Sequence, residues 1–205
     1  MHKVLPLVLY ALILLTFSSC KDTDNRLISK DPMVLAFFTV EEAKELQLIH
    51  DFFIDQICPT GDENNANGAS CLTQFMQDNK IAATTTGAID IPIEHTQKVE
   101  FLKQLSPALF NKIWTEHYEF GYLEHDNEKT YMHFLYELGY YNDLIKEYSE
   151  ECMSRGGVNG FASSLILNQP DEFDMTDCKQ RLLIAIHYFT WDYNNHISEK
   201  VYGEI

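Results

Sequence analysis

Side chains that could perform catalysis or hold a metal are scattered along this chain. His133 and Glu137 lie four positions apart, as do Asp192 and His196, so a metal ion could bridge either pair on one face of a helix. The chain has neither a His-Glu-x-x-His run nor the repeated Glu-x-x-His pair of di-iron bundles. We therefore interpret both pairs as ordinary contacts on helix surfaces and predict no bound metal.

A calcium-binding loop is the second candidate. Glu63, Asn65 and Asn67 place oxygen ligands at alternate positions, and Gly68 follows at the sixth, as in an EF-hand. The twelfth position is Gln74, which cannot supply the bidentate carboxylate that such a loop needs. We favour an Asn- and Gly-rich turn at this place, and we predict no cofactor.

Covalent catalysis has no recognisable motif in this sequence. A Gly-x-Ser-x-Gly elbow is absent, and Ser163 and Ser164 lie in a stretch that looks like a loop. The glycines at positions 156, 157 and 160 are not followed by the Lys-Ser/Thr of a phosphate-binding loop. With 31 acidic residues in the chain, no single pair of carboxylates points to glycoside hydrolysis. We assign no catalytic residue and expect a non-enzymatic protein; a hydrolase or metal-dependent enzyme with a dispersed site is the alternative.

The N-terminus has the layout of a secretory signal. Residues 1–3 carry one firm positive charge, residues 4–17 are almost entirely apolar, and Ser18 and Ser19 precede Cys20. The apolar run is shorter than the roughly 20 residues that span a bilayer as a helix. A cleaved signal peptide at residues 1–19 is therefore favoured over a retained transmembrane anchor.

The sequence Leu-Thr-Phe-Ser-Ser-Cys at positions 15–20 resembles the lipobox of bacterial lipoprotein precursors, with Phe17 in place of the usual aliphatic residue. That resemblance implies that Cys20 begins the mature chain and carries the lipid. The Lys-Asp-Thr-Asp sequence at positions 21–24 looks like the tag that sends some Gram-negative lipoproteins to the cell surface. We expect an exported protein anchored in the outer membrane, on its periplasmic or surface-exposed side. The alternative is an ordinary cleaved signal with an incidental Cys.

Five cysteines are present, and four remain if Cys20 takes a lipid. Cys58 and Cys71 bracket a polar loop, and Cys152 and Cys178 bracket a segment with three glycines and a proline. In an oxidising compartment we expect these neighbours to form two disulfides, each contributing about 3 kcal/mol in the chain-entropy model. Free buried thiols are the alternative. A cysteine-based zinc site is not expected, because no two cysteines lie two or three residues apart.

Composition places the chain among globular proteins and restricts its partners. It has 205 residues, 45% of them hydrophobic, and a formal net charge of −16. Residues 1–19 contain one Lys and no acidic residue, so the rest carries 14 Lys+Arg against 31 Asp+Glu, or −17. Because phosphate backbones and anionic lipids are bound through clustered Lys and Arg, this balance argues against nucleic acid or a charged lipid surface as a ligand. Membrane attachment is expected only through the lipid.

The elements that must position these side chains read as helices. Thr39 and Glu42 form a capping box, Ser106-Pro107 is a helix start, and apolar residues recur every three or four positions. We find no alternating strand pattern and no repeat. The prediction is one all-α domain of about six or seven helices at residues 37–205, behind a lipidated N-terminus and tether at residues 20–36. The expected helices are 39–58, 71–78, 94–105, 107–121, 127–138, 141–154 and 174–201.

Tyrosines and glutamates gather in one part of the sequence and indicate a protein-binding surface. Tyrosine is favoured at interfaces, and a glutamate rim suits a basic partner. We therefore predict an acidic protein-binding module, in one version an immunity or inhibitor protein against a secreted toxin or wall-degrading enzyme. A structural envelope lipoprotein is a further alternative, and the oligomeric state is left open. The candidate binding face consists of Glu116, Glu119, Tyr122, Glu124, Tyr136 and Glu137.

Overall fold

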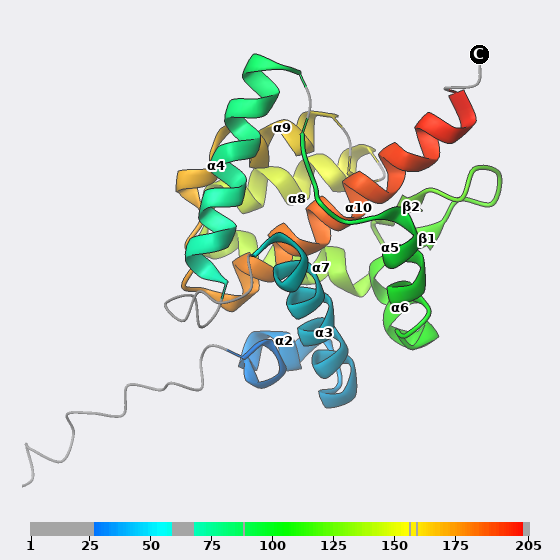
Figure 1. The fold of residues 1–205 in the computed structure, drawn as a ribbon. Coiled ribbons are helices and arrows are strands. Elements are labelled where there is room, and N and C mark those ends of the chain that lie inside the picture. Colours follow the sequence, from blue (N-terminus) through cyan, green and yellow to red (C-terminus); the bar gives the residue numbers. More distant parts are fainter. Residues whose placement is uncertain (1–26, 59–67, 88, 156, 159, 203–205) are drawn as a thin grey trace, which may run out of the picture.

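The computed structural model describes residues 27–58, 68–87, 89–155, 157–158 and 160–202, and they form a helical domain (Figure 1). This confirms the all-α prediction. Three 3₁₀ turns, η2 (Ile28–Lys30), η3 (Gly139–Tyr141) and η4 (Pro170–Glu172), and two short strands, β1 (Thr115–Glu116) and β2 (Leu123–Glu124), complete the described part. The α-helices are α2 (Pro32–Phe37), α3 (Val40–Ile57), α4 (Ala69–Thr85), α5 (His95–Leu102), α6 (Pro107–Ile113), α7 (Thr130–Leu138), α8 (Asp143–Arg155), α9 (Gly160–Asn168) and α10 (Cys178–Tyr202).

The long helix α10 is the central element of the domain. It contacts α3, α5, α9, η2 and strand β2 (Figure 1). Residues 181–190 are buried on every side, which is the pattern of a helix enclosed by its neighbours. Beyond residue 190 the helix is only half buried or exposed, so its C-terminal half offers side chains to neighbouring surface elements.

Local capping determines where two helices begin. At α3 the Glu42 N–H donates to Thr39 Oγ1 at 3.2 Å, and the Thr39 N–H donates to Glu42 Oε2 at 2.8 Å, as the capping box predicts. At α6 the Leu109 N–H donates to Ser106 Oγ at 3.2 Å, and proline follows the cap as expected. Both signals involve residues within three positions of each other, which is why the sequence reveals them.

The described residues contain nine α-helices rather than the six or seven expected, because α2 and α9 form where a tether and a loop were predicted. Helix α4 is about twice as long as expected, and α9 replaces the loop predicted around Ser163 and Ser164. The helix expected over residues 107–121 ends at Ile113, and the chain then forms a β-hairpin. Trp114 has an extended backbone, and its fully buried indole donates from Nε1 to Thr190 Oγ1 of α10 at 2.8 Å.

The folded domain extends further toward the N-terminus than residue 37. Ile28 is fully buried, and the Asp31 carboxylate caps α2 through the N–H groups of Met33 and Val34. The same carboxylate forms an ion pair with Lys179 of α10 at 3.0 Å. Residues 27–36, which the sequence analysis assigned to the tether, therefore belong to the domain. Cys20 and residues 21–26 lie outside the described residues.

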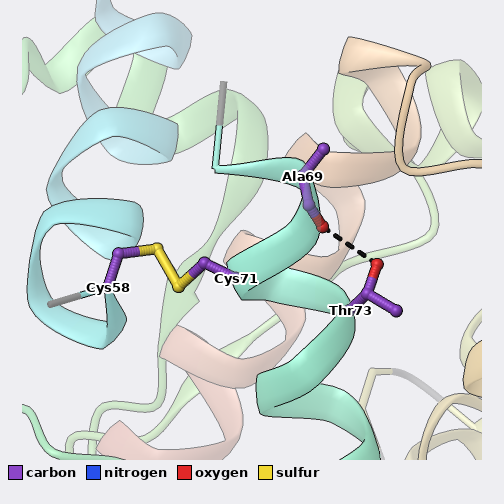
Figure 2. Close-up of a disulfide and its surroundings, with 4 residues drawn as sticks. All are labelled: Cys58, Ala69, Cys71 and Thr73. Atoms are coloured by element: carbon purple, nitrogen blue, oxygen red, sulfur yellow. Dashed lines mark hydrogen bonds between the residues drawn. A yellow bond between two sulfur atoms is a disulfide. The ribbon is translucent and has the colours of Figure 1, made fainter. Parts of the chain in front are cut away.

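One of the two expected disulfides is present. Cys58 and Cys71, which are 13 positions apart in the sequence, join the end of α3 to the first turn of α4 (Figure 2). The second pairing is wrong, because Cys152 and Cys178 are free buried thiols. Cys152 lies in the core beside the Tyr148 hydroxyl, whereas Cys178 starts α10 within the electrostatic influence of Asp31. Burial raises the pKa of Cys152 to about 12 and that of Cys178 to about 11, so both behave as small apolar side chains.

Candidate functional site

The β-hairpin carries four of the six residues proposed for binding. Strands β1 and β2 pair antiparallel, with Thr115 opposite Glu124, and residues 117–122 form a protruding loop between them (Figure 1). The His117 N–H donates to the Tyr122 carbonyl at 2.7 Å, and the Gly121 N–H donates to the His117 carbonyl at 2.8 Å. Gly121 has a φ of +75°, a conformation that glycine adopts without strain. The hairpin therefore has a defined shape.

The C-terminal half of helix α10 holds this hairpin in place. The Asn194 side chain makes two hydrogen bonds to the backbone of Leu123, accepting from its N–H at 2.8 Å and donating to its carbonyl at 2.8 Å. Asn194 thus occupies the place that another strand would take beside β2. One turn further, the Ser198 hydroxyl lies 3.3 Å from the Tyr122 hydroxyl. With Trp114 buried at the start of β1, the hairpin is attached at both strands.

The tip of the hairpin combines aromatic rings with negative charge. Tyr118 is 92% exposed, and its ring stacks on His117 at a centroid distance of 5.2 Å. Phe120 lies against the other rings of the loop, at 5.3 Å from His117 and 5.8 Å from Tyr122. Glu116 and Glu119 are exposed and Glu124 is half exposed. An exposed tyrosine surrounded by carboxylates is well suited to contact a basic protein surface.

Two hollows flank the hairpin, one beside each strand. The first has a volume of about 220 Å³ and is lined by Glu116, Lys103 and apolar side chains of α5 and α6. The second has a volume of about 370 Å³ and is lined by Glu124, Arg155 and residues of α10. Lys103 pairs with Glu100 at 2.6 Å, and Arg155 pairs with Glu151. Both cations are thus already neutralised, and no ion pair to a hairpin glutamate is found among the described residues.

The six residues of the predicted binding face divide between two surfaces. Glu116, Glu119, Tyr122 and Glu124 lie on the hairpin, whereas Tyr136 and Glu137 lie on α7. Among the described residues no hydrogen bond, ion pair or ring contact is found between these two groups. The residues that sequence reasoning left off the face are three strongly exposed tyrosines: Tyr118, Tyr140 (65% exposed) and Tyr141 (78% exposed).

The surface at α7 is a separate aromatic cluster. Tyr136 meets Tyr140 edge to face at a centroid distance of 5.6 Å, and a hydrogen bond between their hydroxyls raises the pKa of Tyr140. Their exposure could have been predicted in part, since Tyr136 and Tyr140 are four positions apart and off the apolar face of the helix. The tertiary structure was needed to show that Tyr141 is not covered.

In the structure, Asp192 and His196 each contact a residue other than their predicted partner. Asp192 forms an ion pair with the buried Lys98, whose ammonium also donates to the Ile93 carbonyl at 3.0 Å. Burial raises the pKa of Asp192, partly offset by the hydrogen bond from Lys98. His196 instead stacks on His95 at a centroid distance of 4.0 Å. In the part of the chain that the structure describes, no three His, Cys, Asp or Glu side chains gather as a metal site.

The other candidate residues that the structure describes are exposed on helices or make local hydrogen bonds. His133 and Glu137 are exposed on α7. Ser164 on α9 donates its hydroxyl to the Phe161 carbonyl at 2.7 Å, as a helix-surface serine commonly does. Of the calcium-loop candidates, residues 63–67 lie outside the described residues, and Gln74 donates to Asp78 Oδ1 at 2.8 Å. These contacts give no arrangement of nucleophile and base.

The comparisons with known proteins give no relative. No protein-family model matches the chain, and no curated protein or solved structure is significantly similar to it. Among the described helices none is long and apolar enough to cross a membrane. The functional conclusion therefore rests on the sequence of the N-terminus and on the surface of the domain.

Proposed function

We propose that this chain is an exported lipoprotein, anchored through Cys20 in the outer membrane, whose domain binds a protein with a basic surface. The lipobox-like sequence before Cys20 supports the anchor, and the net charge of −17 after residue 19 supports the charge of the partner. An acidic domain attracts basic proteins over several ångströms and accelerates their association. An immunity or inhibitor protein that blocks a cationic toxin or wall-degrading enzyme is the specific form of this proposal.

The observation that carries the binding role is the hairpin tip. Exposed aromatic side chains dominate the binding energy of many interfaces, provided that they are held rigidly and need little ordering on association. Tyr118 meets both conditions, because it is almost fully exposed and the hairpin that carries it is hydrogen-bonded within its loop and, through Leu123, to α10. Glu116 and Glu119 beside it supply the charge that would select a basic partner.

The anchor is tested by replacing Cys20 with serine. We expect the wild-type protein to sediment with outer membranes and to incorporate a labelled fatty acid. The Cys20→Ser variant should incorporate no fatty acid and should move to the soluble fraction of the envelope. A variant that still sediments with membranes would contradict the lipoprotein proposal.

The binding surface is tested by photo-crosslinking in cells. A photoreactive amino acid is placed at position 118 on the hairpin and, as the matched control, at position 141, which is also a strongly exposed tyrosine. We expect a discrete adduct from position 118 that contains a basic protein and is lost when Glu116 and Glu119 are changed to glutamine. No adduct at position 118, or one unaffected by these changes, would contradict the proposal.

A further inference from the structure

A groove of about 680 Å³ runs along α4. In Figure 1, α4 lies on the opposite side of the domain from strands β1 and β2. The walls of the groove come from three segments that are distant in sequence. Ile57 ends α3, Phe75 and Ala82 lie on one face of α4, and Pro92 lies on the extended segment that leads to α5. This volume is within the range of about 300–1,000 Å³ that is typical of ligand sites in proteins.

The groove is held open by contacts on all of its walls. The disulfide between Cys58 and Cys71 joins α3 to α4 at one end (Figure 2), and the Cys71 side chain lines the groove itself. Asn79, only 3% exposed, fixes the opposite wall, because its side chain accepts from the Asp90 N–H at 2.9 Å and donates to the Phe75 carbonyl at 3.0 Å. A site built in this way needs little rearrangement to accept a ligand.

The floor of the groove is also fixed. The Phe75 ring lies edge-on to Phe53 at 5.7 Å and to Tyr188 at 5.0 Å, both of which are buried core residues. Phe75 is therefore partly buried against the core while it lines the groove. An apolar stem placed on this ring would remove apolar surface from water at about 25 cal/mol per Å².

The charges of the groove have one sign. Asp78 of α4 and Asp90 of the extended segment line it, and both are exposed. Asp78 accepts one hydrogen bond, from Gln74, and no ion pair to either carboxylate is present among the described residues. The described residues that line the groove include no Lys, Arg or His. The groove thus presents an apolar floor together with carboxylates, the combination that fits a cation at the end of an aliphatic stem.

We infer that this groove binds a segment of a partner protein that carries lysine or arginine, with the aliphatic stem on Phe75 and the cationic group at Asp78 and Asp90. The inference goes beyond the hairpin, because it adds a second binding site on another part of the domain. It rests on the proposed function only for the basic character of the partner. The site itself can be tested with peptides, without knowledge of that partner.

The test measures binding of a short blocked peptide containing leucines and lysines to the purified full chain in detergent, by fluorescence anisotropy. We expect saturable binding that weakens as salt is raised, with hydrogen-exchange protection gained at α4 and at residues 89–93. The same peptide with acetylated lysines should bind at least about tenfold more weakly. Equal affinity for the two peptides, or protection elsewhere only, would overturn the inference.

Two double variants test whether the peptide binds in the groove along α4. Changing Asp78 and Asp90 together to asparagine should weaken peptide binding about tenfold, because two exposed carboxylates lose their attraction for the cation. The matched control changes Glu147 and Glu150 of α8 to glutamine; both are exposed, and the net charge changes by the same amount. Affinity should be nearly unchanged in this control. An equal loss of affinity in both double variants would show that the peptide responds to the overall charge of the domain, and it would overturn the proposed binding site.

A steric variant and a competitor complete the test. Ala82→Phe should fill the groove and abolish peptide binding while both carboxylates stay, with an unchanged circular dichroism spectrum confirming the fold. An alkyl diamine should compete with the labelled peptide only weakly. Competition as strong as that of unlabelled peptide would show that the groove binds a free amine, and it would overturn the inference that the ligand is a protein segment. These outcomes are independent of photo-crosslinking at the hairpin, so failure of one proposal is distinguishable from failure of the other.

Discussion

Two buried histidines should make the domain unstable in mild acid. His125 donates from Nδ1 to the Ile113 carbonyl at 2.8 Å, and burial lowers its pKa to about 4 although that hydrogen bond opposes the shift. His187 lies 3.1 Å from the Tyr148 hydroxyl, and burial, with a smaller contribution from His125, lowers its pKa to about 3. Both imidazoles are therefore neutral in the folded protein at pH 5.

The size of the effect follows from proton linkage. An unfolded histidine titrates near 6.5, so below this pH the unfolded state binds more protons than the folded state. Stability is complete above pH 6.5 and declines as the pH falls toward the folded pKa of each histidine. At pH 5 each histidine lowers the free energy of unfolding by about 2 kcal/mol, or about 4 kcal/mol together. This is a large part of the roughly 5–15 kcal/mol that stabilises most domains.

The assay is urea unfolding followed by circular dichroism at pH 7 and at pH 5. Wild-type protein should lose about 4 kcal/mol between the two conditions, and His125→Gln or His187→Gln should each reduce this loss by about 2 kcal/mol. The exposed His133→Gln is the control and should leave the loss unchanged. If His125→Gln and His187→Gln both show the same pH dependence as the wild type, the reasoning is refuted.

Three further predictions concern the disulfide, the free thiols and a buried ion pair. Cys58→Ser opens a loop of 13 positions and should lower the free energy of unfolding by about 3 kcal/mol in urea titrations; a loss below about 1 kcal/mol would contradict this. Cys152 and Cys178 should stay unreactive toward a thiol reagent while the protein is folded, and after unfolding they should consume two equivalents of the reagent. Reaction in the folded state would show that these thiols are accessible. Lys98→Met should cost about 3 kcal/mol, because Asp192 is left half-buried without its cation, and adding Asp192→Leu should recover most of that loss; no recovery would assign the cost to packing.

Sequence reasoning succeeded where the determining interactions are local. The start of α3 was predictable because Thr39 and Glu42 are three residues apart and bond each other. The disulfide between Cys58 and Cys71 was predictable because it closes a short loop between two helices. The same reasoning failed for Cys152 and Cys178, since nearness in sequence did not bring these side chains together in the core.

The hairpin and the groove could not have been predicted in this way. The hairpin exists because Trp114 is buried against Thr190, 76 positions later, and because Asn194 bonds Leu123, 71 positions earlier. The groove along α4 depends on Asn79 holding the segment at Asp90, and hydrophobic periodicity carries no signal for such a contact. The predicted binding face was divided for the same reason, because its residues are close in sequence but lie on two separate elements.

The sequence by itself determined the helical class, the acidity of the domain and the resemblance of its N-terminus to a lipoprotein precursor. These properties depend on composition and on residues within a few positions of each other. Only the tertiary structure decided which tyrosines are exposed, which histidines are buried, and that Cys152 and Cys178 stay unpaired. Exposure and pairing depend on how helices pack across distances of many residues, and that packing is a property of the whole chain.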